Sequence, residues 1–130
     1  MLNSKNQHHP ATAQVHRFLS TIIDKDIKGF ASFFDLDASF TNILPSGRRI
    51  VSGIELIKER SIFFASPVTR FEHGPLIDVV EDTKSFAAGT QAQVIRVDGS
   101  ELKLYLRLTF VLAHCQRWIP RLIQNTIMEA

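Results

Sequence analysis

The chain has 130 residues, of which 45% are hydrophobic, and this is enough for one domain with a buried core. A net charge of +2 without any basic run argues against a nucleic-acid partner. The single cysteine, Cys115, excludes an intrachain disulfide and a cysteine metal cluster. No apolar run approaches the roughly 20 residues of a membrane span, and the polar start of the chain lacks the apolar centre of a signal peptide. We therefore expect a soluble, cytoplasmic protein with no membrane partner.

Two helices are predicted in the first part of the chain. Residues 1–11 are polar, hold almost nothing to bury, and are predicted to form a flexible tail. Asp26 has a side chain preferred at helix N-caps, so a short second helix is expected to follow it. The first helix begins at Thr12 and carries an apolar face at helical spacing, made of Val15, Phe18, Leu19, Ile22 and Ile23.

The next segment is predicted to hold a small hairpin and a third helix. Residues 38–44 alternate as a strand, Pro45-Ser46-Gly47 is a turn by composition, and residues 48–51 return as a second strand. The run Ser52-Gly53-Ile54-Glu55 matches a capping box, in which the serine oxygen caps a helix that ends before Pro67. Residues 69–80 are predicted to form a strand interrupted at Gly74-Pro75, which indicates a bulge or an edge position.

The strongest pattern is the alternation of residues 101–112, where every second side chain is apolar, as in a strand with one buried face. Asp98-Gly99 before it is a strong signal for a two-residue hairpin loop. Such a loop places Gln91 and Gln93 on the same face as the leucines. Glutamines on an apolar face need hydrogen-bond partners, which makes these two candidate ligand-binding residues.

A second two-residue turn is predicted near Cys115 and Gln116. It would place Arg121 opposite Phe110 on the leucine face, together with Asn125. A slip by one residue would exchange the two faces of the last strand, and the sequence leaves that alternative open. The opposite, outer face is expected to be the interface of a homodimer, because its mixed apolar and polar stripe is too aromatic to stay in water. It would gather Tyr105, Arg107, Thr109, Trp118, Leu122 and Gln124.

Three patterns are typical of one known fold: residues 33–40, the turn at 45–47 followed by 52–54, and residues 107–112 followed after a short turn by Trp118. With the order of the elements, they resemble the nuclear transport factor 2-like superfamily, which includes ketosteroid isomerases and SnoaL-type polyketide cyclases. The resemblance spans roughly residues 13–126. It implies an α+β, cone-shaped fold, in which three helices of the N-terminal half pack on the concave face of a strongly curved, mostly antiparallel sheet. A single domain would occupy residues 12–130.

The resemblance also implies a ligand cavity inside the cone, but the isomerase residues are replaced. The catalytic tyrosine, which follows an arginine in the first helix, corresponds to Phe18 after Arg17. The place of the base aspartate holds Asn42, and the hydrogen-bonding aspartic acid corresponds to Leu108. Because phenylalanine and leucine cannot donate a hydrogen bond and an amide cannot act as a carboxylate base, no ketosteroid isomerisation is expected.

The predicted cavity face combines apolar side chains with a few polar groups, which suits an apolar small molecule with a polar or acidic head. Arg121 is the candidate anchor for an acidic head, but it can equally pair with Asp35, Asp37 or Glu55 and hold helix to sheet. No metal-ligand spacing is present, and no cofactor is expected. The predicted lining residues are Phe18, Asn42, Gln91, Gln93, Leu108, Phe110, Arg121, Ile123 and Asn125.

Two function classes remain open, with a third behind them. The first is a small-molecule-binding protein or a cofactor-independent enzyme with isomerase, cyclase or dehydratase-like chemistry. The second is a non-catalytic homodimerising accessory module that works through the outer sheet face, whose exposed aromatic side chains would need covering. The third, a transport adaptor, is supported by the fold pattern alone. A cavity of roughly several hundred Å³ would favour the first class, and a core filled by phenylalanines would favour the second.

Overall fold

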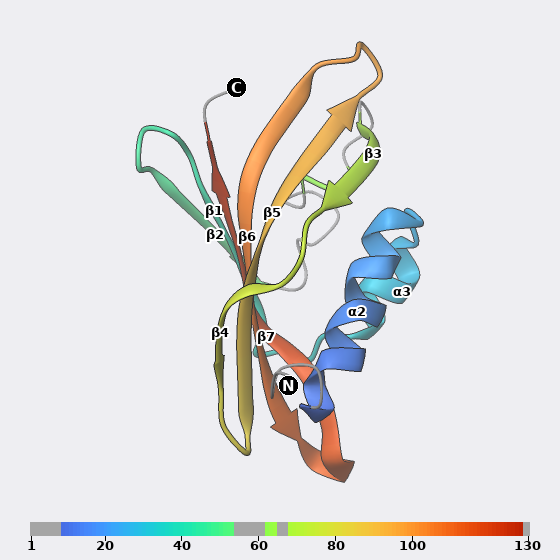
Figure 1. The fold of residues 1–130 in the computed structure, drawn as a ribbon, viewed down its shortest axis with the longest axis vertical. Helices are drawn as coiled ribbons and strands as arrows, with labels where there is room; N and C mark the ends of the chain where they lie inside the picture. The colour runs from blue at the N-terminus through green and yellow to red at the C-terminus, as the bar shows by residue number, and fades with distance from the viewer. Residues whose placement is uncertain (1–8, 54–61, 65–67, 129–130) are drawn as a thin grey trace, which may run out of the picture.

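The computed structural model describes residues 9–53, 62–64 and 68–128. Figure 1 shows a strongly twisted sheet with the described helices on one of its faces. The helices are α2 (Pro10–Ile23) and α3 (Ile27–Ser32), and η2 (His114–Gln116) is a single 3-10 turn. The strands are β1 (Ser39–Ile43), β2 (Arg49–Gly53), β3 (Val68–His73), β4 (Ile77–Glu81), β5 (Ser85–Arg96), β6 (Glu101–Ala113) and β7 (Arg117–Ile127).

The described strands form one sheet in the order β2-β1-β7-β6-β5-β3, and β4 also pairs with β5. Every pair is antiparallel except β1 with β7. The long strands β5, β6 and β7 lie at the centre and carry the helices on their concave side (Figure 1). The predicted α+β fold with a curved, mostly antiparallel sheet is thereby confirmed. No helix in the described ranges combines the length and the apolar composition that a membrane span requires.

The first helix, α2, begins two residues earlier than predicted. The His9 side chain accepts a hydrogen bond from the Ala11 amide at 3.1 Å, and Pro10 fits the first turn, where no amide partner is lost. The His9 ring also contacts Phe86 and Trp118, with ring centroids 4.9 and 5.0 Å apart. The start of α2 is therefore fixed both by its cap and by aromatic contacts with the sheet.

The core lies between the helices and the concave face and is built mainly from aromatic rings. All ten phenylalanines of the chain are buried in it or packed against it. Asp26 caps α3 as predicted, because its Oδ1 accepts a hydrogen bond from the Gly29 amide at 3.0 Å. This cap positions Phe30, which makes ring contacts with Phe18, Phe34, Phe40, Phe63 and Phe64.

The loop between β5 and β6 has three residues, 97–99, instead of the predicted two. The Arg96 amide donates to the Ser100 carbonyl, and the Gly99 amide donates to the Arg96 carbonyl, both at 2.9 Å. Gly99 has a φ of 86°, the left-handed conformation that closes a three-residue hairpin loop. The extra loop residue shifts the register of β5 by one.

This shift exchanges the two faces of β5. Gln91 lies opposite Tyr105 and Gln93 lies opposite Lys103, so both glutamines belong to the outer face. The prediction that they share a face with the leucines is wrong. The concave face of β5 instead carries Phe86, Ala88, Thr90, Ala92 and Val94.

The hairpin between β6 and β7 has two irregularities whose effects on the strand register cancel. Its loop, His114–Gln116, has three residues instead of two, and β7 carries a bulge at Arg121. Beyond the bulge the predicted register is confirmed. Between the loop and the bulge every pair is shifted by one residue, so Phe110 lies opposite Pro120 and its predicted pairing with Arg121 is wrong.

The same shift places the Trp118 side chain on the opposite face of the sheet from the predicted one. It lies opposite Leu112, is 8% exposed and belongs to the core on the concave side. The prediction that Trp118 stands on the outer face is therefore wrong, because the bulge between the loop and the rest of β7 was not anticipated.

The predicted third helix falls mainly outside the described residues. In the short described stretch, Phe63 is buried and lies between the partly buried Ile62 and Phe64. Ser52, the predicted cap of this helix, belongs to β2, and its Oγ has no hydrogen-bond partner among the described residues. The amide that Ser52 is predicted to cap, that of residue 55, lies outside the described residues.

Candidate functional site

A row of polar side chains crosses the largely apolar concave face. Asn42 on β1 and Asn125 on β7 are direct neighbours, and Asn125 Nδ2 donates to Asn42 Oδ1 at 2.9 Å. Thr90 on β5 continues the row and donates to the Gly74 carbonyl at 2.9 Å. Ser52 stands nearby on β2, and all four of these side chains on the strands are buried. The predicted position of Asn125 opposite Leu106 is confirmed.

Two atoms of this polar group have no hydrogen-bond partner within the described part of the chain: Asn125 Oδ1 and Ser52 Oγ. Asn125 is 1% exposed and Ser52 is 4% exposed, so water does not supply the missing contact at the surface. A buried polar group left unpaired costs about 1–3 kcal/mol, and its presence in a native fold calls for an explanation. The two residues flank β1, Asn125 from β7 and Ser52 from β2.

The neighbouring part of the concave face is packed with aromatic and aliphatic side chains. The Phe18 ring lies 5.8 Å from the Phe110 ring, in an edge-to-face arrangement. Leu108 lies opposite Ile123, as predicted. These four predicted lining residues are at most 1% exposed and come together as members of the core.

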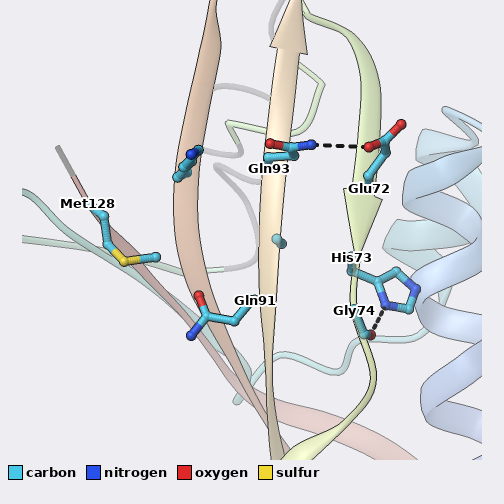
Figure 2. A pocket seen from close by; sticks show the side chains of 8 residues that line it. Glu72, His73, Gly74, Gln91, Gln93 and Met128 are labelled. Carbon is cyan, nitrogen blue, oxygen red and sulfur yellow. Dashed lines mark hydrogen bonds between the residues drawn. The ribbon is translucent and has the colours of Figure 1, made fainter. Parts of the chain in front are cut away.

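A hollow of about 350 Å³ lies across β3, β5 and β6, with most of its long side chains on the outer face. Gln91, Gln93 and Met128 help to line it, so the two glutamines meet at a site other than the predicted cavity. Figure 2 shows the His73 ring turned toward the helices, away from Gln91 and Met128. Its Nδ1 makes a hydrogen bond with the carbonyl oxygen of the following residue at 2.7 Å.

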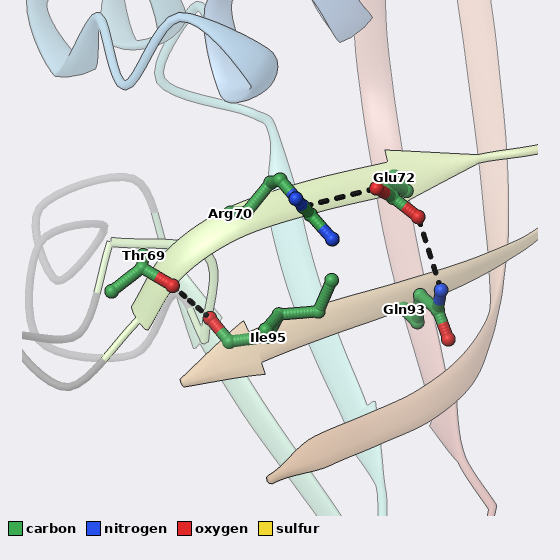
Figure 3. Close-up of polar contacts among 5 residues, drawn as sticks. All are labelled: Thr69, Arg70, Glu72, Gln93 and Ile95. Carbon is green, nitrogen blue, oxygen red and sulfur yellow. Dashed lines mark hydrogen bonds and ion pairs between the residues drawn. The ribbon is translucent and has the colours of Figure 1, made fainter. Parts of the chain in front are cut away.

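The polar groups at the edge of this hollow already pair with one another. Figure 3 shows Glu72 between Arg70 and Gln93. Arg70 Nε lies 3.0 Å from Glu72 Oε2, and Gln93 Nε2 donates a hydrogen bond to Glu72 Oε1 at 3.1 Å. Thr69 Oγ1 donates to the Ile95 carbonyl at 3.0 Å. Exposed pairs of this kind contribute at most about 1 kcal/mol each. Both carboxylate oxygens of Glu72 are engaged, one with Arg70 within β3 and the other with Gln93 across to β5, which favours a structural role.

Tyr105 and Arg107 stand on the outer face, as predicted, but bond within their own chain. The Tyr105 hydroxyl donates to Asp78 Oδ2 at 2.7 Å, and Arg107 donates to the Asp78 carbonyl at 2.8 Å. Partial burial and the hydrogen bond to Asp78 raise the pKa of the Tyr105 phenol above its ordinary value. Asp78 has a left-handed φ of 53°, and these contacts hold the irregular start of β4 against β5.

The other predicted outer-face residues keep their places. Thr109 pairs with Leu122, and Arg107 pairs with Gln124. The row of Thr109 and Leu122 extends through β5 to Val80 on β4. Of the six residues predicted for this face, only Trp118 lies on the other side of the sheet.

Arg121 lies beside one of its three predicted carboxylate partners. Its Nη2 is 3.4 Å from Asp35 Oδ2, and the two side chains are 40% and 43% exposed. The pair connects β7 to the segment between α3 and β1. It lines a hollow of about 510 Å³ beside the loop between β6 and β7. The structure therefore supports the alternative in which Arg121 holds two parts of the fold together.

Two residues that belong to candidate sites in the structure, Ser52 and Lys84, are not among those predicted from the sequence. Ser52 was assigned to a helix cap, although Ile50 and Ser52 alternate with the exposed Val51 in the manner of a strand. The second residue, Lys84, lines the hollow that contains Arg121. No local pattern marks Lys84, because the contact depends on how distant strands meet.

No protein-family model matches the sequence, and no curated protein matches it either. Solved structures do match over nearly the whole chain. A protein of unknown function with a cystatin-like fold, from Nostoc punctiforme, is 12% identical, with a TM-score of 0.69 over 99% of this chain and 96% of that chain. A nuclear transport factor 2-like superfamily protein from Salmonella enterica serovar Typhimurium is 15% identical, with a TM-score of 0.67 over 96% of this chain and 92% of that chain.

A third similar structure is that of TerC, co-crystallised with polyporic acid. It is 13% identical, with a TM-score of 0.60 over 96% of this chain and 92% of that chain. Ketosteroid isomerase-like proteins are among the further matches. Similarity at these identities concerns the backbone arrangement and carries no residue roles with it. The chain has the nuclear transport factor 2-like fold, also described as cystatin-like.

Proposed function

We propose that the protein binds a small, mostly apolar molecule against the concave face of its sheet and holds a hydroxyl group of that molecule with Asn125 and Ser52. The observation that carries this proposal is a pair of buried polar atoms, Asn125 Oδ1 and Ser52 Oγ, that have no hydrogen-bond partner within the described ranges. A ligand group between them would supply the missing hydrogen bonds, while the surrounding apolar side chains would contact the rest of the molecule.

The chemistry of the two atoms selects the polar group of the ligand. Asn125 Oδ1 can only accept a hydrogen bond, whereas the Ser52 hydroxyl can donate or accept. A neutral hydroxyl can serve both, but a carboxylate cannot donate to an amide oxygen. Arg121, the predicted anchor for an acidic head, is paired with Asp35. We therefore expect alcohols and phenols to bind in preference to the matching acids.

Binding, without a reaction, is what these groups support. Two amides and a hydroxyl are neither acids nor bases at neutral pH, so they can orient a molecule but cannot move its protons unaided. The fold is compatible with a small ligand, since TerC was co-crystallised with polyporic acid.

Ser52→Ala is expected to separate stability from binding. Removal of a buried hydroxyl that has no partner should raise the free energy of unfolding of the ligand-free protein by about 0.5–1 kcal/mol. The same change should weaken binding of a hydroxyl-bearing ligand by about three- to tenfold, since a neutral hydrogen bond is worth about 1 kcal/mol. Chemical denaturation measures the first effect, and thermal-shift titration with naphthol and decanol measures the second.

Ser39→Ala is the matched control, because Ser39 belongs to the outer face of the same β1-β2 hairpin. It should leave the affinity for both alcohols unchanged. Ser52→Ala should weaken the binding of naphthoate and decanoate less than that of the alcohols, because a carboxylate cannot donate to Asn125 Oδ1. Equal affinities of the Ser52→Ala and unsubstituted proteins for the alcohols would remove Ser52 from the site.

A second candidate function is that of a homodimerising accessory module, and two observations favour it. The phenylalanines pack closely on the concave side, which by itself argues for a filled core. On the outer face, Val80, Ala87, Thr109 and Leu122 form one row across four strands, and Val80 is 65% exposed. A second copy of this chain placed against that row would cover it.

Leu122→Glu is expected to weaken such a dimer by at least about tenfold while leaving the fold intact. A charge at a half-buried position on the outer face can remain in water in the monomer but would be desolvated without a partner in the dimer. Sedimentation velocity over a range of concentrations measures the change. Val97→Glu is the control, because Val97 is 75% exposed in the loop between β5 and β6. A monomer at micromolar concentration in the unsubstituted protein would contradict the dimer itself.

A further inference from the structure

The loop between β6 and β7 borders a hollow whose described lining includes neither Asn125 nor Ser52. The hollow has a volume of about 510 Å³, within the range of small-molecule pockets. The charged residues that line it are Asp35, Lys84 and Arg121, and Leu112 and His114 are among the others. At neutral pH, Lys84 and Arg121 give it two positive charges against the single negative charge of Asp35.

Arg121 uses only part of its hydrogen-bonding capacity. Its Nη2 reaches Asp35 Oδ2 at 3.4 Å, which is long for a charge-assisted hydrogen bond. Its Nε is buried, and no atom in the described part of the chain accepts a hydrogen bond from it. A guanidinium carries five N–H donors in a fixed plane, so Arg121 retains donors for a second acceptor.

Lys84 is held at the hollow by its backbone. The Leu112 amide donates to the Lys84 carbonyl at 2.9 Å, and the Lys84 amide donates to Asp82 Oδ1 at 2.8 Å. Asp82 Oδ1 also accepts from the Ser85 amide at 2.8 Å and the Ser85 hydroxyl at 3.0 Å, so this carboxylate oxygen is committed to the turn. The Lys84 ammonium group, by contrast, pairs with none of the described residues.

We propose that this hollow binds the oxyanion of a small molecule, a carboxylate or a phosphate, between Arg121 and Lys84. A planar oxyanion can accept from the guanidinium in two places, and Lys84 adds a point charge. Asp35 competes for the same guanidinium and sets how strongly the site binds. This site is independent of the ligand proposed for the concave face, because it shares no residue with Asn125 or Ser52.

Isothermal titration of the full chain at low ionic strength tests the site, with phenyl phosphate and benzoate as separate probes. Lys84→Gln and Arg121→Gln should each weaken binding by roughly five- to tenfold, since each removes one charged donor. Asp35→Asn should have the opposite effect and strengthen binding by about threefold, because it frees Arg121. Asparagine keeps the Oδ1 acceptor that bonds the Asp37 amide at 3.0 Å, so the turn is retained.

Lys103→Gln is the matched control, since it removes the same charge at the other end of β6 and should leave both affinities unchanged. The probe that binds more tightly identifies which oxyanion the hollow prefers. Added salt should reduce the binding of either probe, as expected for a partly exposed charged site. No saturable binding of either probe to the unsubstituted protein, or equal binding by all four variants, would overturn the proposal. Lys84 is exposed, so Lys84→Gln remains informative even if Arg121→Gln fails to fold.

Discussion

Phe30→Ala is expected to lower the free energy of unfolding by about 3–5 kcal/mol, the range found when a buried phenylalanine is truncated. Phe30 is fully buried and contacts five other phenylalanine rings, the nearest being Phe18 with centroids 4.9 Å apart. Its loss would leave a cavity bordered by α2, α3 and β1 that rigid rings cannot easily fill. Because domains of this size are stable by only about 5–15 kcal/mol, the loss would be a large fraction of the total.

Chemical denaturation followed by the fluorescence of Trp118 measures this effect, since it is the only tryptophan and is buried in the same core. Leu36→Ala is the control, because Leu36 is 89% exposed and should change the stability by no more than about 0.5 kcal/mol. A loss below about 1 kcal/mol for Phe30→Ala would mean that the rings are loosely packed. Loose packing would leave more room for a ligand on the concave face than the ring contacts indicate.

The order of the elements could be predicted from local patterns, because each has a local physical cause. Asp26 caps α3, and the alternation of residues 101–112 marks β6. Gly74 and Pro75 mark the break between β3 and β4, where a missing amide and an irregular backbone end the ladder. These features depend on few neighbours in sequence.

The registers of the two long hairpins were harder to predict, because each depends on a loop that local composition describes poorly. Asp98-Gly99 fits a two-residue loop and also the end of a three-residue loop with a left-handed glycine. The alternation of β5 itself could have decided between them, since Phe86, Ala88, Ala92 and Val94 are apolar. Pro120 carried a comparable signal, because a proline inside a central strand indicates a bulge.

The candidate sites depended directly on these registers. A slip of one residue sends Gln91 and Gln93 to the outer face and Trp118 to the core. Asn42 and Asn125 kept their places, because the part of β7 beyond the bulge has the predicted register. The hollow at Arg121 could not be predicted, since it forms where a loop, a bulge and the segment before β1 meet.

Gly89→Ala is expected to destabilise the protein by about 1–3 kcal/mol, the usual cost of overpacking a filled site. Gly89 lies opposite Arg107 on β6, and the Tyr105 ring lies over it. A Cβ added at Gly89 would come within 1.9 Å of the Tyr105 hydroxyl oxygen and 2.3 Å of Cζ, so the ring would have to move. That movement would break the 2.7 Å hydrogen bond to Asp78 and loosen β4 at the sheet edge. Chemical denaturation measures the loss, and hydrogen exchange of the β4 amides shows where it acts.

The Tyr105→Ala background makes this explanation specific. Removal of the ring takes away the three atoms nearest to an added Cβ at position 89. Because glycine is less favourable than alanine inside a strand by roughly 0.5–1 kcal/mol, the same substitution should then become neutral or stabilising. Gly74→Ala is the positional control, since a Cβ there would lie 3.8 Å from the nearest heavy atom, the Gln91 carbonyl oxygen, which is ordinary contact. A Gly89→Ala loss of the same size with and without Tyr105 would show that the backbone of β5, and not the tyrosine, requires the glycine. If Gly89→Ala lowers the free energy of unfolding only when Tyr105 is present, the glycine is required because the Tyr105 ring packs over it. Tyr105 in turn holds the edge strand β4 through its hydrogen bond to Asp78.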